Sequence, residues 1–122
     1  MILVDTSIWI DHFRRGDPLL SERLDKRQVL CHPWVIGELA LGALVQRDEI
    51  LHLLSALPQA VVAQPDEVLQ FVDHHALART GIGYVDAQLL AASQLTPETR
   101  LWTRDARLVR QAIRLGLAAP AA

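Results

Sequence analysis

Cysteine and long apolar runs are nearly absent from this sequence, and each absence excludes a class of protein. The single cysteine, Cys31, cannot form an internal disulfide, and one free thiol is typical of a reducing cytoplasm, where we expect this protein. No apolar run reaches the roughly 18 residues that a membrane-spanning helix needs. No basic segment precedes an apolar one near the first residue, so we expect neither a signal peptide nor a membrane contact.

Charge is low overall but unevenly distributed. The net charge is −2 in a chain of 122 residues, of which 51% are hydrophobic, and these proportions predict one globular domain over residues 1–122. Residues 1–99 carry 13 acids and 7 bases, whereas residues 100–122 carry 5 bases and 1 acid. All bases except Lys26 are arginines, which suit phosphate contacts, although a GC-rich genome gives the same bias. The charge therefore neither demands nor excludes a nucleic-acid partner.

Short apolar segments alternate with helical segments along the chain. Residues 2–5, 28–31, 60–63 and 100–103 predict buried strands, and residues 117–119 predict an edge strand. Thr6 or Ser7 is a candidate cap for the first helix, and caps, prolines and glycines predict further helices over residues 18–26, 33–45, 47–57, 66–78, 84–94 and 106–115. The alternation predicts an α/β fold, a three-layer α/β/α sandwich around a parallel sheet of four to five strands.

Four acidic residues fall where such a fold binds ligands, outside the carboxyl ends of its strands. Asp5 ends the first strand, Asp105 follows the fourth, and Asp86 lies in the first turn of a helix. Glu38 lies within an otherwise apolar helix, where an unpaired buried carboxylate costs several kcal/mol. Helix capping and the helix dipole also explain Asp105 and Asp86 taken singly. Taken together, the four residues predict one acidic pocket.

Carboxylates crowded into one pocket repel one another unless a cation is bound. Mg²⁺, or Mn²⁺, prefers such oxygen ligands and keeps several waters, whereas no His and Cys spacing typical of zinc is present. An ion with open water positions suits phosphoryl chemistry, because it activates a water and stabilises the charge that develops on the phosphate. The pocket therefore predicts phosphoryl chemistry that depends on Mg²⁺ or Mn²⁺.

Four segments carry a family resemblance: ILVDTSIWIDHFR, the GEL of IGELALG, GYVDAQLLAAS and LWTRDARL. In order and spacing they resemble the four acidic motifs of the PIN-domain ribonucleases, and in particular those of the VapC toxins of bacterial toxin–antitoxin pairs. The resemblance covers the chain from residue 2 to about residue 117. It implies a metal-dependent endoribonuclease that acts on structured RNA such as tRNA or rRNA. It also implies a homodimer and inhibition by a cognate antitoxin that reaches the acidic pocket.

The resemblance also assigns roles to individual residues. It implies that the metal-binding and catalytic acids are Asp5, Glu38, Asp86 and Asp105. The supporting hydroxyl positions correspond to Thr6, Ser7 and Thr103. No departure from the family pattern occurs at the four acids.

Five arginines are candidate RNA contacts. Four are expected along one side of the last helix and one closes the first helix: Arg104, Arg107, Arg110, Arg114 and Arg14. An ordinary solvated helix face explains the same residues, so both interpretations stand. Residues 34–57 are more apolar than one sheet-facing stripe requires, and we expect them to form part of a dimer or antitoxin surface.

Two other classes of protein share part of this pattern of acids. Aspartyl phosphatases and receiver-type phosphorylation domains also begin with an Asp after the first strand, but both need a lysine for the phosphate. The single lysine, Lys26, lies far from a strand end, and Ser7 stands where the phosphatases usually have a second acid. The alternative that stays open is a non-catalytic RNA-binding or protein-binding module with a metal-stabilised acidic pocket.

Overall fold

The computed structural model of this chain describes residues 1–120. Three short strands are present, β1 (Ile2–Val4), β2 (Val29–Leu30) and β3 (Arg100–Trp102). The helices are α1 (Thr6–Arg15), α2 (Pro18–Asp25), α3 (Pro33–Ala40), α4 (Arg47–Ala56), α5 (Pro65–His74), α6 (Tyr84–Leu95) and α7 (Ala106–Arg114). Within residues 1–120, none of these helices is long and apolar enough to span a bilayer.

The sheet is parallel, with β1 at its centre and strand order β2-β1-β3. Leu3 of β1 pairs with Leu30 on one side and with Leu101 on the other. Two further segments add one bridge each, since Cys31 pairs with Gln59 beside β2, and Leu101 pairs with Ala118 beyond β3. The prediction of an α/β fold with a parallel sheet is confirmed, but the predicted four to five strands exceed the three that form within residues 1–120.

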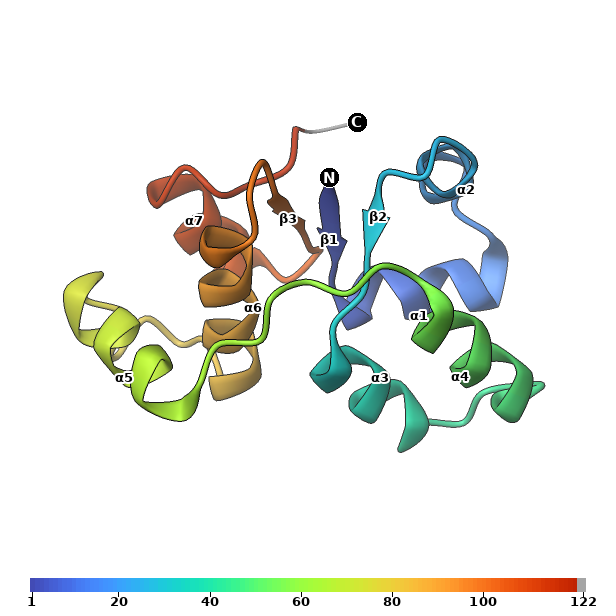
Figure 1. Cartoon of the computed structure of the whole chain (residues 1–122), viewed down its shortest axis with the longest axis horizontal. Helices are drawn as coiled ribbons and strands as arrows, with labels where there is room; N and C mark the ends of the chain where they lie inside the picture. Colours follow the sequence, from blue (N-terminus) through green and yellow to red (C-terminus); the bar gives the residue numbers. More distant parts are fainter. Residues whose placement is uncertain (121–122) are drawn as a thin grey trace.

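Helices lie on both sides of this sheet. The chain crosses from β1 to β2 through α1 and α2, and from β2 to β3 through α3 to α6. The second crossing spans both sides, because Figure 1 shows α3 and α4 with α1 and α2 on the right of the strands and α5 to α7 on the left. Helix α3 packs against α1 and α4 on one side, and α6 packs against α5 and β3 on the other. Both groups of helices meet at the carboxyl ends of the strands.

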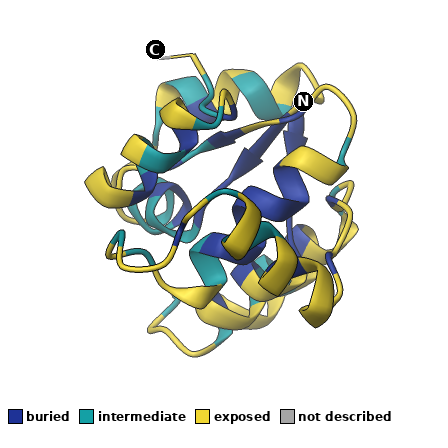
Figure 2. Ribbon diagram, turned by 90° about the vertical axis from the view of Figure 1, so that its left-hand side faces the viewer, coloured by how far each residue is buried: buried dark blue, intermediate teal, exposed yellow. Residues whose placement is uncertain are grey.

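The hydrophobic core surrounds the sheet. All three residues of β1 are buried, and Leu89, Leu90 and the other inward residues of α6 cover one face of the sheet. Figure 2 shows buried residues along the strands and the inner sides of the helices, with exposed residues outside them. The strand ends at Val4, and Asp5, which follows it, is still buried at the junction between β1 and α1.

Three local predictions were wrong. Residues 60–63 form no strand, because Ala60 and Ala63 are buried while Val61 and Val62 between them are exposed, and this pattern lacks the two-residue period of a strand. Helix α3 ends at Ala40 instead of continuing to residue 45. The N-cap position of α1 is occupied by Asp5, so Thr6 and Ser7 belong to its first turn.

Candidate active site

Asp5 is the most buried acid of the predicted pocket. It stands between β1 and α1, is 6% exposed, and as the N-cap residue of α1 makes no capping hydrogen bond with its side chain. The carboxylate instead accepts hydrogen bonds at Oδ2 from Ser7 Oγ (2.9 Å) and Thr103 Oγ1 (2.7 Å). These two hydrogen bonds fix the orientation of the carboxylate.

The loop after β3 brings in the second acid. Asp105 is the N-cap of α7, and its Oδ1 accepts hydrogen bonds from the backbone N–H groups of Arg107 (2.9 Å) and Leu108 (3.2 Å). The Asp105 N–H donates to Thr103 Oγ1 (3.1 Å), so one threonine hydroxyl links this loop to Asp5. The capping bonds orient the carboxylate and leave its second oxygen without a hydrogen bond within residues 1–120.

Glu38 reaches the pocket from α3. It is exposed, and its Oε1 accepts a hydrogen bond from the hydroxyl of Thr6 in the first turn of α1 (2.7 Å). This contact ties α3 to α1 beside Asp5 and explains how an acid is accommodated in an apolar helix. The predicted supporting roles of Thr6, Ser7 and Thr103 therefore correspond to real hydroxyl–carboxylate hydrogen bonds in the structure.

The pKa of Asp86 depends on its burial and on the other three acids. Its Oδ2 accepts a hydrogen bond from the Gly83 N–H (2.9 Å) at the start of α6. Burial raises the pKa of the Asp86 carboxyl, the Gly83 hydrogen bond lowers it, and the charges of Asp5, Asp105 and Glu38 raise it further. The four acids are therefore near enough for their charges to interact.

The chemistry of the four acids decides which kind of metal ion the pocket could hold. Within residues 1–120, no three acidic, imidazole or thiol side chains converge closely enough to surround an ion directly. The four candidate ligands are nevertheless all carboxylates, with hydroxyls beside them, and these are hard oxygen donors. Mg²⁺ is usually held by one or two carboxylates and retains several waters, so the set fits a hydrated ion of this kind.

The candidate RNA-binding arginines do not form one stripe. Arg104 lies in the loop before α7, where its guanidinium pairs with Asp11 and with Asp17, so it is not free for a phosphate. Arg114 donates to the carbonyl of His75 at 2.7 Å, and Arg110 is near the carbonyl of Ala106 in its own helix at 3.4 Å. The prediction that Arg104 lies on the last helix was wrong, because its neighbour Asp105 caps that helix.

Two of these arginines do lie beside the acidic pocket. The side chain of Arg107 packs across Gly81, where an added Cβ would lie only 2.9 Å from Arg107 Cδ. Gly81 has a φ of +89°, a conformation that favours glycine, whereas the flexible Arg107 side chain could shift away from a Cβ. Arg14, at the end of α1, lines a groove of about 740 Å³ that also contains Glu38. These two residues remain the better candidates for RNA contacts.

Sequence reasoning missed the clamp that holds the loop after β3. Asp11 of α1 and Asp17, the N-cap of α2, bind the Arg104 guanidinium together, and the Arg104 N–H donates to Ser7 Oγ (3.1 Å). Asp17 was recognisable as a turn residue in Gly-Asp-Pro, but nothing in the sequence indicates a partner 87 residues away. The clamp holds Thr103 and Asp105 against α1.

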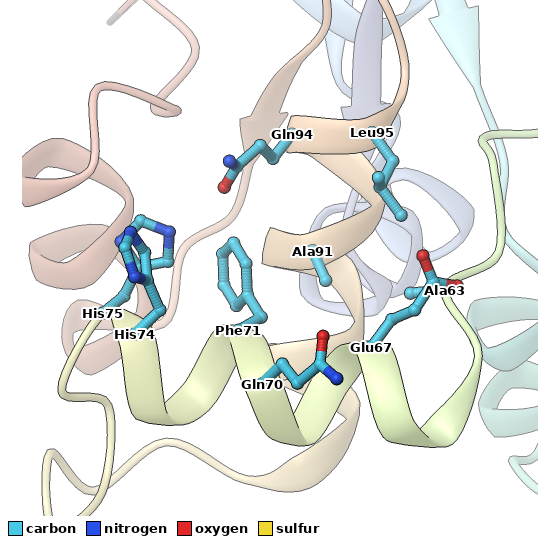
Figure 3. A pocket seen from close by; sticks show the side chains of 9 residues that line it. All are labelled: Ala63, Glu67, Gln70, Phe71, His74, His75, Ala91, Gln94 and Leu95. Atoms are coloured by element: carbon cyan, nitrogen blue, oxygen red, sulfur yellow. The ribbon is translucent and has the colours of Figure 1, made fainter.

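The groove beside Glu38 and a smaller hollow lie on different parts of the surface. The groove that contains Glu38 continues along α1 and the segment 41–46, where its walls include Phe13, Leu44 and Val45. A smaller hollow of about 340 Å³ lies between α5 and α6, where Phe71, His74 and Gln94 point towards it (Figure 3). The smaller hollow is lined by none of the four acids.

Comparison with known proteins agrees with this geometry. Residues 2–114 match the PIN domain family, and the chain therefore belongs to that family. Ribonuclease VapC32, from two strains of Mycobacterium tuberculosis, is 49% identical to this chain over 118 residues, which is 97% of this chain and 95% of the relative. The chain is thus a PIN domain of the VapC type, as its four acidic motifs predict.

Proposed function

We propose that this protein is a metal-dependent endoribonuclease, the toxin of a VapBC-type toxin–antitoxin pair that cleaves structured RNA such as tRNA or rRNA. The observation that supports the proposal is the placement of four carboxylates after β1, on α3, in the first turn of α6 and at the N-cap of α7, near enough for the other three charges to act on Asp86. The similarity to Ribonuclease VapC32 supports the same reaction.

The catalytic roles follow from the surroundings of each acid. Asp5, Glu38, Asp86 and Asp105 would hold Mg²⁺ or Mn²⁺, which when bound supplies a water of lowered pKa and charge neutralisation at the phosphate. Ser7 and Thr103 keep the Asp5 carboxylate in one orientation. Thr6 holds Glu38 towards α1. Burial is the largest cause of the raised pKa of Asp86, and a bound cation would offset the smaller contribution of the three neighbouring charges.

The groove beside Glu38 is where we place an antitoxin. Its walls are largely apolar, Val45 is 81% exposed and Leu41 nearby is 92% exposed, and such a surface is typical of a partner site. Because the groove contains Glu38, a segment bound there ends at the acidic pocket and blocks it. A homodimer and a cytoplasmic location belong to the same proposal.

The proposal is tested by incubating total cellular RNA with the purified protein in Mg²⁺, in Mn²⁺ and in EDTA. Asp5→Asn is the test variant, because it keeps the size and one acceptor oxygen of the side chain and removes the charge. Asp66→Asn is the matched control, since Asp66 is an exposed acid in the first turn of α5. Discrete fragments that require the metal, persist in the control and vanish with Asp5→Asn are the expected result.

The opposite result would favour the alternative function. If the folded protein binds RNA but cleaves none of it with either metal, the domain is a binding module and the acidic pocket serves stability alone. End-mapping of any fragments identifies the RNA and the bond that is cleaved.

A further inference from the structure

Two of the six aromatic side chains lie outside the core, and they lie together. Trp34 is 42% exposed, Tyr84 is 43% exposed, and their ring centroids are 5.8 Å apart with an interplanar angle of 66°. The other four aromatics are buried or packed against the hydrophobic core, namely Trp9, Phe13, Phe71 and Trp102. An exposed pair that joins two different helices is therefore a feature of this surface that the core does not require.

The pair borders the acidic pocket. Trp34 lies four residues before Glu38 on α3, so the two side chains share one face of that helix. Tyr84 is the first residue of α6, two residues before Asp86. The contact between the two rings thus connects the two helices that carry half of the acids.

Hydrogen bonds fix the backbone that carries Trp34 and the hydroxyl of Tyr84. The Trp34 backbone N–H donates to Nδ1 of the fully buried His32 (3.0 Å), which fixes the start of α3. The Tyr84 hydroxyl accepts a hydrogen bond from Nε2 of Gln88 (3.2 Å), and Gln88 is 1% exposed. In an edge-to-face pair, the ring that contributes its edge keeps both of its faces uncovered by its partner. The pair therefore presents a fixed, open aromatic face.

We infer that Trp34 and Tyr84 form a stacking site for one unpaired base of the RNA, next to the bond that is cleaved. The inference rests on the proposed nuclease function and adds a residue-level account of substrate binding. An acidic pocket repels the phosphate backbone, so the flat, uncharged base is the part of RNA that this rim binds without a cation. Sequence-specific and single-stranded RNA recognition generally stacks splayed bases on aromatic side chains. The site then takes any base, because every base has an aromatic face, and it requires an RNA that is unpaired at that position.

Binding is measured first, with a short single-stranded oligoribonucleotide of mixed sequence as the probe. All variants carry Asp5→Asn so that cleavage is absent, and binding is followed by fluorescence anisotropy of a labelled probe. Trp34→Ala and Tyr84→Leu are expected to weaken binding by about 5- to 100-fold each, the usual effect of removing one stacking side chain. Trp34→Phe retains a ring and is expected to restore most of the affinity. Leu69→Ala is the control, since Leu69 is an exposed apolar residue of α5.

Cleavage is measured next, on the fragment that end-mapping identifies. Trp34→Ala is expected to raise KM with little change in kcat, because the ring contributes to binding and not to the bond that breaks. Replacing one nucleotide at a time by an abasic nucleotide is expected to identify one position at which KM rises as it does with Trp34→Ala. At that position, the abasic substrate and Trp34→Ala together have no more effect than either alone.

The outcomes separate this inference from the nuclease proposal. If the unmodified protein cleaves RNA but Trp34→Ala and Tyr84→Leu bind and cleave as it does, the stacking site is refuted and the nuclease stands. If those variants instead disrupt a homodimer or lose antitoxin with RNA affinity unchanged, the pair is a protein contact and the inference is wrong. If the unmodified protein cleaves nothing, the proposed function fails, and the binding series alone decides whether a base stacks here.

Discussion

His32 makes the stability of this protein sensitive to mild acid. The residue is 0% exposed, and its Nδ1 accepts the Trp34 N–H at the start of α3. Its Nε2 is buried and has no hydrogen-bond partner within residues 1–120. Burial lowers the pKa of His32 from 6.5 to about 4. A protonated imidazole would be a buried cation without a partner, and its Nδ1 would no longer accept the helix N–H.

The pH dependence follows from the two pKa values. Because the pKa in the folded state is lower than in the unfolded chain, the unfolded chain binds the proton more readily between about pH 6.5 and 4. The stabilising contribution is therefore complete above about pH 6.5 and is lost as the pH falls towards 4. Each pKa unit corresponds to about 1.4 kcal/mol, so the loss is about 2 kcal/mol at about pH 5 and about 3 kcal/mol at about pH 4.

The measurement is urea unfolding followed by tryptophan fluorescence across this pH range. His32→Asn is the comparison, because asparagine caps a helix well and does not titrate. The smaller side chain lowers stability equally at every pH, and the titration of the carboxylates cancels in the difference between the two proteins. The difference should shrink by about 2 kcal/mol between about pH 7 and about pH 5. A constant difference over this range would show that His32 does not titrate as its burial requires.

Two substitutions near the acids have defined consequences. Thr103→Val keeps the shape of the side chain but removes the hydroxyl that donates to Asp5 and accepts from the Asp105 N–H. It should lower the free energy of unfolding by about 2–4 kcal/mol in urea titrations and should also reduce cleavage, whereas a loss below about 0.5 kcal/mol would contradict the role of this hydroxyl. Arg104→Gln removes two ion pairs of a side chain that is 42% exposed, so we expect a loss of about 1 kcal/mol at most. Because Arg104 is already paired with two carboxylates, its substitution should leave the salt dependence of RNA binding unchanged. Arg107→Gln should instead lower the number of counterions released on RNA binding by about one, measured in the same salt titration.

The site was more predictable from the sequence than the edges of the sheet. An acid at the end of a buried strand or in the first turn of a helix has a position fixed by local geometry, which is why Asp5, Asp86 and Asp105 could be placed from the sequence. The segment 60–63 failed because its apolar composition resembles a strand, but a strand forms only where a neighbour offers a ladder of hydrogen bonds. The Val61 N–H is instead bound by the side chain of Thr96. Such long-range contacts, like the clamp on Arg104, leave no local pattern.

The hydrogen bond between Thr103 and Asp5 joins residues 98 positions apart, and it bears on how the protein is made. Asp5 is synthesised long before its supporting threonine and the neighbouring Asp105. The strand that brings these two residues in, β3, pairs directly with β1. A chain synthesised only as far as β3 accordingly has three of the four acids and no assembled pocket. The ribosome that makes this protein meets a complete acidic pocket only after Asp105 has been added.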